Sequence, residues 1–249
     1  MSDETTSIVP TAQSPREPRT VGIERGTQWL ADGWRMFRAA PAIWIALTVV
    51  LFVIQVLLHL VPFFGGIASA LLMPVFLGGL MAGCAAQERD EDLQFDTLLA
   101  GFRANTGNLI TLGLLSVAAM VAIALAAFLI GGGAMMGGLW SGQVAPVAGA
   151  TLAVGGMLMA WLLVMALSVP LTMALWFAVP LVMLGDAAPL AALKGSFSAC
   201  LKNVLPFLVY GVVVFVLGFI AAIPFGLGLL VLVPVVVGSV YASYRDIFL

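Results

Sequence analysis

Between Ala104 and Gly185 the chain reads ANTGNLITLGLLSVAAMVAIALAAFLIGGGAMMGGLWSGQVAPVAGATLAVGGMLMAWLLVMALSVPLTMALWFAVPLVMLG, 82 residues without Asp, Glu, Lys or Arg. A soluble domain of this size needs charged side chains on its surface, whereas the hydrocarbon core of a bilayer, about 30 Å thick, excludes them. Two further charge-free blocks flank this stretch, Ala39–Gln87 with 49 residues and Asn203–Tyr244 with 42 residues. The sequence therefore predicts an all-α, polytopic transmembrane helix bundle.

The composition of the whole chain favours the same class. Of the 249 residues, 62% are hydrophobic and 9% are charged, against roughly a quarter charged in an ordinary globular domain. Continuous apolar runs of about 20 residues are typical of spanning helices, whereas the strands of a membrane β-barrel alternate apolar and polar residues. The formal net charge is −2, so no basic surface for nucleic acid is predicted.

Prolines and charged segments divide the apolar blocks into six expected spans. We expect residues 1–20, rich in Ser, Thr, Pro and Glu, to form a disordered cytoplasmic tail, and residues 21–249 to form a single six-span domain. The expected spans are Pro41–Val61, about Phe63–Gln87, about Leu109–Ile130, Ala150–Leu184, Val204–Ile223 and Gly226–Ser243.

Two stretches of the central block leave alternatives open. Gly131–Gly149 begins GGGAMMGGLWSG, which predicts a flexible connection or a shallow re-entrant loop. Ala150–Leu184 contains Pro170 and Pro180, and at 1.5 Å per residue it makes roughly 50 Å of helix. We expect one tilted, proline-kinked span there, and a span followed by a short re-entrant segment is the alternative.

Three amphipathic segments, each preceding a pair of spans, predict surface helices. They share one spacing, in which a leucine is followed by a small residue and an aromatic residue. The pattern predicts a threefold helix-plus-hairpin repeat over about residues 21–87, 88–184 and 185–249, with chance similarity as the alternative. The small residue allows close packing, and Trp34, Phe102 and Phe197 are candidate interfacial docking residues. The three patterns are Leu30-x-x-Gly33-Trp34, Leu98-x-x-Gly101-Phe102 and Leu193-x-x-Ser196-Phe197.

Catalytic and metal chemistry are not indicated. Asp186 follows a Gly, but Met183 stands where an intramembrane aspartyl protease motif needs its first Gly, and no second Asp lies in a span. The central glycines are not followed by the Lys and Ser/Thr of a phosphate-binding loop. A lone histidine and two isolated cysteines do not make a metal site. We expect no enzyme activity, no cofactor and no metal.

Few polar residues fall inside the expected spans. Gln55 and His59 lie four residues apart on one face of the first span, which makes them the candidates for a polar contact or a polar pathway within the membrane. We expect a structural contact, because ion-coupled transporters generally place acidic residues in their spans and this chain has none there.

Three groups of residues match a known pattern: Trp29-Leu30-x-x-Gly33-Trp34-x-x-Phe37, Lys202-Asn203 with Pro206, and the ending Tyr241-x-Ser243-Tyr244-Arg245-Asp246-Ile247-Phe248. With these residues the chain resembles an uncharacterised family of proteobacterial six-span integral membrane proteins. The architecture is also similar to the membrane domain of some glycerophosphodiester phosphodiesterases, whose soluble catalytic barrel we do not expect here. The resemblance implies a multi-pass protein of the bacterial inner membrane and transfers no catalytic residue.

Topology and function follow as expectations. With six spans, all ten basic residues fall on one side, and the positive-inside rule places that side, with both termini, in the cytoplasm. We expect a non-enzymatic protein that organises lipids or partner proteins at the cytoplasmic leaflet. Its expected partners are membrane lipids and a membrane protein or a second copy of the chain. A small transporter or permease component is the alternative, and a membrane-embedded enzyme is the second alternative.

Overall fold

The computed structural model describes residues 17–62, 64–143 and 145–249. These residues form helices and connecting turns, with no strand among them. The helices are α1 (Arg25–Ala39), α2 (Pro41–His59), α3 (Phe64–Glu88), the 3-10 helix η1 (Phe95–Leu99), α4 (Ala100–Arg103), α5 (Thr106–Gly142), α6 (Pro146–Trp176), α7 (Ala178–Gly185), α8 (Pro189–Lys202), α9 (Val204–Ala222) and α10 (Leu229–Phe248).

Six helical stretches are long and apolar enough to cross a membrane. They are α2, α3, α5, α6 together with α7, α9 and α10, which lie within a few residues of the six expected spans except in the central block. The prediction of an all-α, six-span polytopic bundle is confirmed. The apolar windows of α3 and α10 are about half buried, at 50% and 56%, whereas those of α5 and α6 are 11% and 0% buried. The exposed apolar surface of α5 and α6 is therefore suited to contact lipid or another membrane protein.

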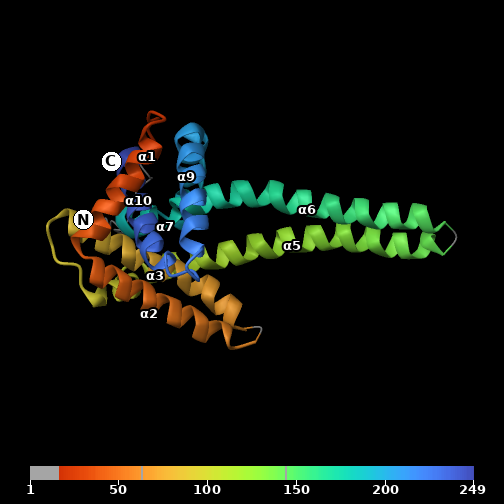
Figure 1. Cartoon of the computed structure of the whole chain (residues 1–249), viewed down its shortest axis with the longest axis horizontal. Coiled ribbons are helices and arrows are strands. Elements are labelled where there is room, and N and C mark those ends of the chain that lie inside the picture. Colours follow the sequence, from red (N-terminus) through yellow and green to blue (C-terminus); the bar gives the residue numbers. More distant parts are fainter. Residues whose placement is uncertain (1–16, 63, 144) are drawn as a thin grey trace, which may run out of the picture.

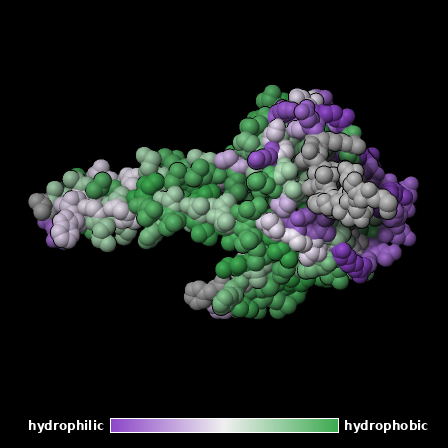
Figure 2. Space-filling model, turned by 180° about the vertical axis from the view of Figure 1, so that it is seen from behind, coloured by the Kyte–Doolittle hydropathy of each residue, from purple (hydrophilic) through white to green (hydrophobic). Residues whose placement is uncertain are grey.

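Three helical hairpins leave a common body in different directions (Figure 1). They are α2–α3, α5–α6 and α9–α10, and α5–α6 is a long arm that extends well beyond the rest. We call the common body the hub and define it as residues 17–51, 75–112, 176–210 and 235–249, because the buried core lies almost entirely there. Hydrophilic residues gather on the hub, whereas the hairpins are largely apolar on the surface (Figure 2).

The expectation of a loop over Gly131–Gly149 is wrong. Helix α5 continues to Gly142, and α6 begins at Pro146 after a short turn. A Cβ on Gly138 would collide with the backbone oxygen of Gly149, so these two glycines mark where two helices approach closely rather than where the chain turns. At 1.5 Å per residue, the 37 residues of α5 extend about 55 Å, well beyond the thickness of a hydrocarbon core.

The fourth candidate span consists of two consecutive helices, α6 and α7. Helix α6 continues through Pro170 and ends at Trp176, and α7 begins at Ala178. The interruption falls at Phe177, three residues before Pro180. The stretch Pro146–Gly185 is long and apolar enough to form one span of 40 residues. The choice of one kinked span over a span with a re-entrant segment stays a prediction.

The second surface segment is shorter than the sequence pattern predicts. It consists of η1 and the single turn α4, in which Leu98 is buried. Phe95, Leu99 and Phe102 are 61%, 48% and 40% exposed, so most of its large apolar side chains are not covered by the hub.

The first 16 residues of the predicted tail lie outside the described residues. Of its remainder, residues 17–20, the backbone N–H of Arg19 donates a hydrogen bond to the backbone oxygen of Ile247 at 2.9 Å. This part of the N-terminal segment therefore lies against the end of α10.

Candidate functional site: the polar hub

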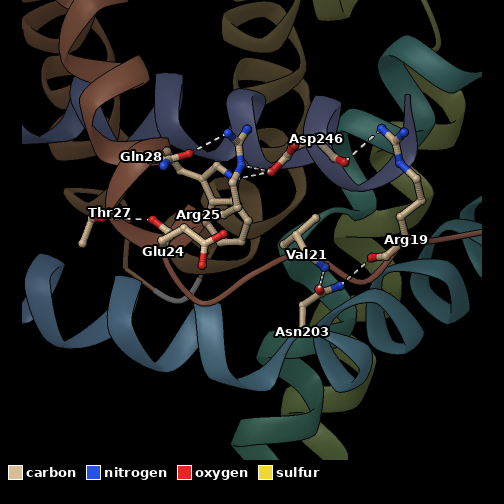
Figure 3. A network of polar contacts seen from close by, with 9 residues as sticks. Arg19, Val21, Glu24, Arg25, Thr27, Gln28, Asn203 and Asp246 are labelled. Carbon is tan, nitrogen blue, oxygen red and sulfur yellow. Dashed lines mark hydrogen bonds and ion pairs between the residues drawn. The ribbon is translucent and has the colours of Figure 1, made fainter.

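The carboxylate of Asp246 joins the two ends of the chain. Its Oδ2 accepts hydrogen bonds from Arg25 Nε at 2.6 Å and from the indole Nε1 of Trp29 at 3.0 Å, and its backbone oxygen accepts from Arg19 Nη2 at 3.1 Å (Figure 3). The hydrogen bond to Asp246 is the main reason why the pKa of Arg25 is raised. Helix α1 and the last turn of α10 are thus joined by an ion pair that is only partly open to solvent.

Asn203 fixes the N-terminal segment to the junction of α8 and α9. The side chain is 1% exposed, and its Oδ1 accepts a hydrogen bond from the backbone N–H of Val21 at 2.8 Å. Its Nδ2 donates to the backbone oxygens of Arg19 at 2.9 Å and Ala199 at 3.0 Å (Figure 3). A buried amide with each polar atom paired costs little to bury and specifies one arrangement of the three segments.

Glu88 connects α3 to α10. Its carboxylate accepts a hydrogen bond from the Tyr241 hydroxyl at 2.5 Å and forms an ion pair with Arg245. One residue earlier, Gln87 Oε1 accepts a hydrogen bond from Trp44 Nε1 on α2 at 3.1 Å. The end of α3 is therefore tied to both neighbouring spans by polar contacts on the hub side.

The residues that carry the family resemblance converge in this hub. Trp29 contacts Asp246, Asn203 holds the N-terminal segment, and Tyr241 and Arg245 both bind Glu88. The sequence pattern singled out one partner of most contacts and missed Glu88. Its position was the available signal, because Glu88 is the first charged residue after the charge-free block that contains α3.

The small residues of the three repeated patterns have equivalent positions. A Cβ on Gly33 would collide with the backbone oxygen of Val235 in α10, and a Cβ on Gly101 would collide with that of Val75 in α3. Ser196 on α8 lies against α6. Each surface segment therefore packs on the second helix of a hairpin that precedes it in cyclic order. Helix α1 packs on α10 of the last hairpin, α4 on α3 of the first, and α8 on α6 of the second.

The hydroxyl of Ser196 is inserted at the end of α6. Its Oγ accepts a hydrogen bond from the backbone N–H of Phe177 at 2.9 Å and donates one to the backbone oxygen of Met173 at 2.6 Å. In an uninterrupted helix these two backbone groups would bond to each other. Ser196 is 0% exposed, so its hydroxyl satisfies both groups away from water and accounts for the interruption at Phe177.

The predicted intramembrane polar residues differ in their contacts. Gln55 faces α3, where its Oε1 accepts a hydrogen bond from Ser69 Oγ at 2.5 Å and its Nε2 lies 3.1 Å from the sulfur of Met73. The ring of His59 is exposed, and its Nδ1 lies 2.8 Å from the backbone oxygen of Gln55 in the same helix. The structure brings Gln55 into a contact between two spans, and it brings no further polar side chain to His59 among the described residues.

The predicted interfacial aromatic residues lie at the edge of the hub. Trp34 is 46% exposed beside Phe37, with ring centroids 5.5 Å apart, and Phe102 is 40% exposed against Phe76 at 5.3 Å. Phe197 is partly buried. Their role in docking stays a prediction.

Four cations of the hub have no carboxylate partner among the described residues. Arg19, Arg38, Lys194 and Lys202 form no ion pair there, although Arg19 Nη2 donates a hydrogen bond to the backbone oxygen of Asp246 and Lys202 Nζ lies 3.4 Å from the backbone oxygen of Pro18. In the same part of the chain no group of three or more His, Cys, Asp or Glu side chains is placed to hold a metal ion. The unpaired cations are therefore free to attract anions from outside the protein.

The six apolar helices and the polar hub define a multi-pass α-helical membrane protein. The chain is 31% identical over 252 residues to a probable inner membrane protein of Burkholderia thailandensis, with 92% of each chain covered. It therefore belongs to the family of that inner membrane protein. No family model matches the chain, and no solved structure matches it. The similarity to the membrane domain of some glycerophosphodiester phosphodiesterases stays a prediction.

Proposed function

We propose that this inner-membrane protein is not an enzyme and that it organises lipids or partner proteins at the cytoplasmic leaflet through its surface helices. The proposal rests on cations that have no carboxylate partner and lie near exposed apolar side chains on the same helices. On α1, Arg38 follows Trp34 by four residues, and Trp34 is 46% exposed. On α8, Lys202 follows Leu201, which is 53% exposed.

This combination favours lipid over protein as the main partner. Helices that present aromatic or aliphatic side chains beside lysine or arginine lie in the headgroup layer, where each cation attracts anionic lipid. The cytoplasmic position of the hub is part of the proposal. It is supported by the basic residues, since every one that the structure describes belongs to the hub, as the positive-inside tendency requires of a cytoplasmic face.

The proposal is tested by extracting the protein with its surrounding lipids in polymer nanodiscs and identifying lipids and proteins together by mass spectrometry. We expect anionic lipids to be enriched around the wild type relative to the whole membrane, and the enrichment to fall in Trp34→Ala/Arg38→Gln. The matched control is Asp96→Asn/Arg103→Gln, which removes a paired anion and cation. A bulk lipid composition around the wild type overturns the lipid role, and a stoichiometric protein in those discs would assign the role to protein partners instead.

A small transporter is the second candidate, and one observation favours it. Gln55 and Met73 line an otherwise largely apolar cavity of about 560 Å³ between α2, α3 and the turn that joins α9 to α10. A polar group in such a cavity could mark a path for a solute. In a variant with both native cysteines replaced by alanine, a cysteine at position 55 is treated with a membrane-impermeant maleimide from each side. Labelling from both sides favours transport, and protection from both sides favours a sealed structural contact.

A further inference from the structure

A second apolar groove opens between α6, α8 and α9. Its volume is about 820 Å³, which lies within the range of roughly 300–1,000 Å³ found for ligand sites. Thr172 and Trp176 of α6 lie on one side, Phe207 and Gly211 of α9 lie on the other, and Leu201 of α8 lies at the hub end. Because α6 and α9 are membrane spans, the groove lies at the depth of lipid acyl chains.

Two lysines of α8 lie next to the hub end of the groove without lining it. Lys202 follows Leu201 directly, and Lys194 lies two helical turns earlier in the row Lys194, Ser198, Lys202. Neither lysine forms an ion pair with a described carboxylate, although Lys202 Nζ lies 3.4 Å from the backbone oxygen of Pro18. Both belong to the helix that contributes Leu201 to the groove, where a lysine attracts an anionic headgroup.

One wall of the groove contains an unsatisfied donor. The indole nitrogen of Trp176 is the one buried side-chain nitrogen or oxygen that lacks a hydrogen-bond partner among the described residues. The rest of the ring is packed between Phe207 and Tyr210, with ring centroids 5.9 and 5.8 Å away. A buried N–H without an acceptor costs about 1–3 kcal/mol, and because protein atoms cover this nitrogen, the donor stays unsatisfied whether or not the groove is occupied.

We infer that this groove binds one anionic glycerophospholipid of the leaflet that contacts the hub. One acyl chain occupies the space between α6 and α9, the phosphate lies at Lys194 and Lys202, and the ester region lies at the level of Trp176. The inference rests on the proposed lipid role and gives it a defined site. A neutral lipid would fill the apolar space but would leave both lysines unpaired, which is why the occupant is anionic.

Gly211 allows the groove to be filled without disturbing the fold. It lines the groove, and a Cβ at this position would meet no atom within 4 Å. Gly211→Phe should therefore occupy the space of the acyl chain. Gly155→Phe is the matched control, because Gly155 also has open space around it but does not line the groove.

The experiment is native mass spectrometry of the purified full-length protein, titrated with phosphatidylglycerol or phosphatidylethanolamine. The wild type should retain one phosphatidylglycerol in preference to phosphatidylethanolamine. Gly211→Phe should lose the bound lipid of either kind, whereas Gly155→Phe should keep it. Lys194→Gln and Lys202→Gln should each reduce the preference for phosphatidylglycerol by about fivefold, while Arg38→Gln on α1 should leave it unchanged.

Two results would overturn the site. One is retention of the bound lipid in Gly211→Phe, with an unfolding temperature that matches the Gly155→Phe control. The other is an unchanged headgroup preference after both lysines are replaced. Failure of the site is distinguishable from failure of the proposed function, because anionic lipid could remain enriched in nanodiscs around a protein that holds no lipid in this groove.

Discussion

The indole nitrogen of Trp29 donates a hydrogen bond to the carboxylate of Asp246 at 3.0 Å, across a sequence separation of 217 residues. The same carboxylate oxygen binds Arg25, so one side chain near the C-terminus holds two side chains of the first helix. This contact closes the hub between the first surface helix and the last span. It also identifies the residue whose loss should affect the hub most.

Replacing Asp246 by alanine should destabilise the protein, because Trp29 and Arg25 then lose a partly buried acceptor. We expect a loss of about 1–3 kcal/mol and a lower unfolding temperature in mild detergent. Asp246→Asn keeps an oxygen for the indole and should lose less. Asp32→Ala is the control, because the Asp32–Arg35 pair lies within one helix with its arginine 72% exposed, and it should cost less than about 1 kcal/mol. Equal losses in Asp246→Ala and Asp32→Ala would contradict this account.

A side chain at Gly33 should separate α1 from α10, because its Cβ would collide with the backbone of Val235 and Ser239. Backbone atoms cannot move aside as a flexible side chain can, so Gly33→Ala should cost at least about 1–3 kcal/mol and increase proteolysis of the N-terminal segment. Gly107→Ala, where a Cβ meets nothing within 4 Å, is the matched control. The prediction fails if both variants resist protease equally well.

Loss of the Ser196 hydroxyl should weaken the junction of α6 and α7. In Ser196→Ala the backbone N–H of Phe177 loses its partner and the backbone oxygen of Met173 keeps only the weak contact from Cys200 Sγ at 3.5 Å, so we expect a cost of about 1–3 kcal/mol. Hydrogen exchange at the Phe177 amide should become faster. Ser198→Ala on the same helix should leave that exchange unchanged. Slow exchange at Phe177 in Ser196→Ala would show that the helix reforms its own bond across the interruption.

The orientation can be tested with reporter fusions after residues 62, 143 and 224, at the turns of the three hairpins. A six-span protein with a cytoplasmic hub places all three turns in the periplasm. Alkaline phosphatase should therefore be active at all three sites, and a cytoplasmic reporter should be active when fused after Leu249. A cytoplasmic signal at any one turn would disprove the six-span topology with cytoplasmic termini.

The sequence predicted the fold where exclusion of charge from the membrane decides it. The ends of α2, α3 and α9 lie within two residues of their predicted limits, because prolines and charged residues mark them. The prediction from the sequence failed at Gly131–Gly149, because glycine is typical both of turns and of close helix contacts. Only the position of α6 beside α5 shows that these glycines belong to a helix pair.

The site was predicted less completely than the fold. The pattern around Gly33 and Gly101 identified residues that pack closely. Their partners could not be predicted, because Val235 is far from Gly33 in the sequence, Val75 precedes Gly101, and neither valine belongs to a recognisable motif. The two ends of one polar contact need not resemble each other, which is why Glu88 was missed while Tyr241 was singled out.

The docking of α1 on α10 has a consequence for biosynthesis. The ribosome synthesises α1 before α10, so the surface formed by Trp29 and Gly33 cannot contact α10 while the intervening spans enter the membrane. In the proposed orientation, with the hub in the cytoplasm, a product truncated before Leu229 would present this apolar surface to the cytosol, where quality-control proteases act on such segments. Such proteases would therefore degrade a chain that lacks α10 and spare a chain in which α1 is packed on α10.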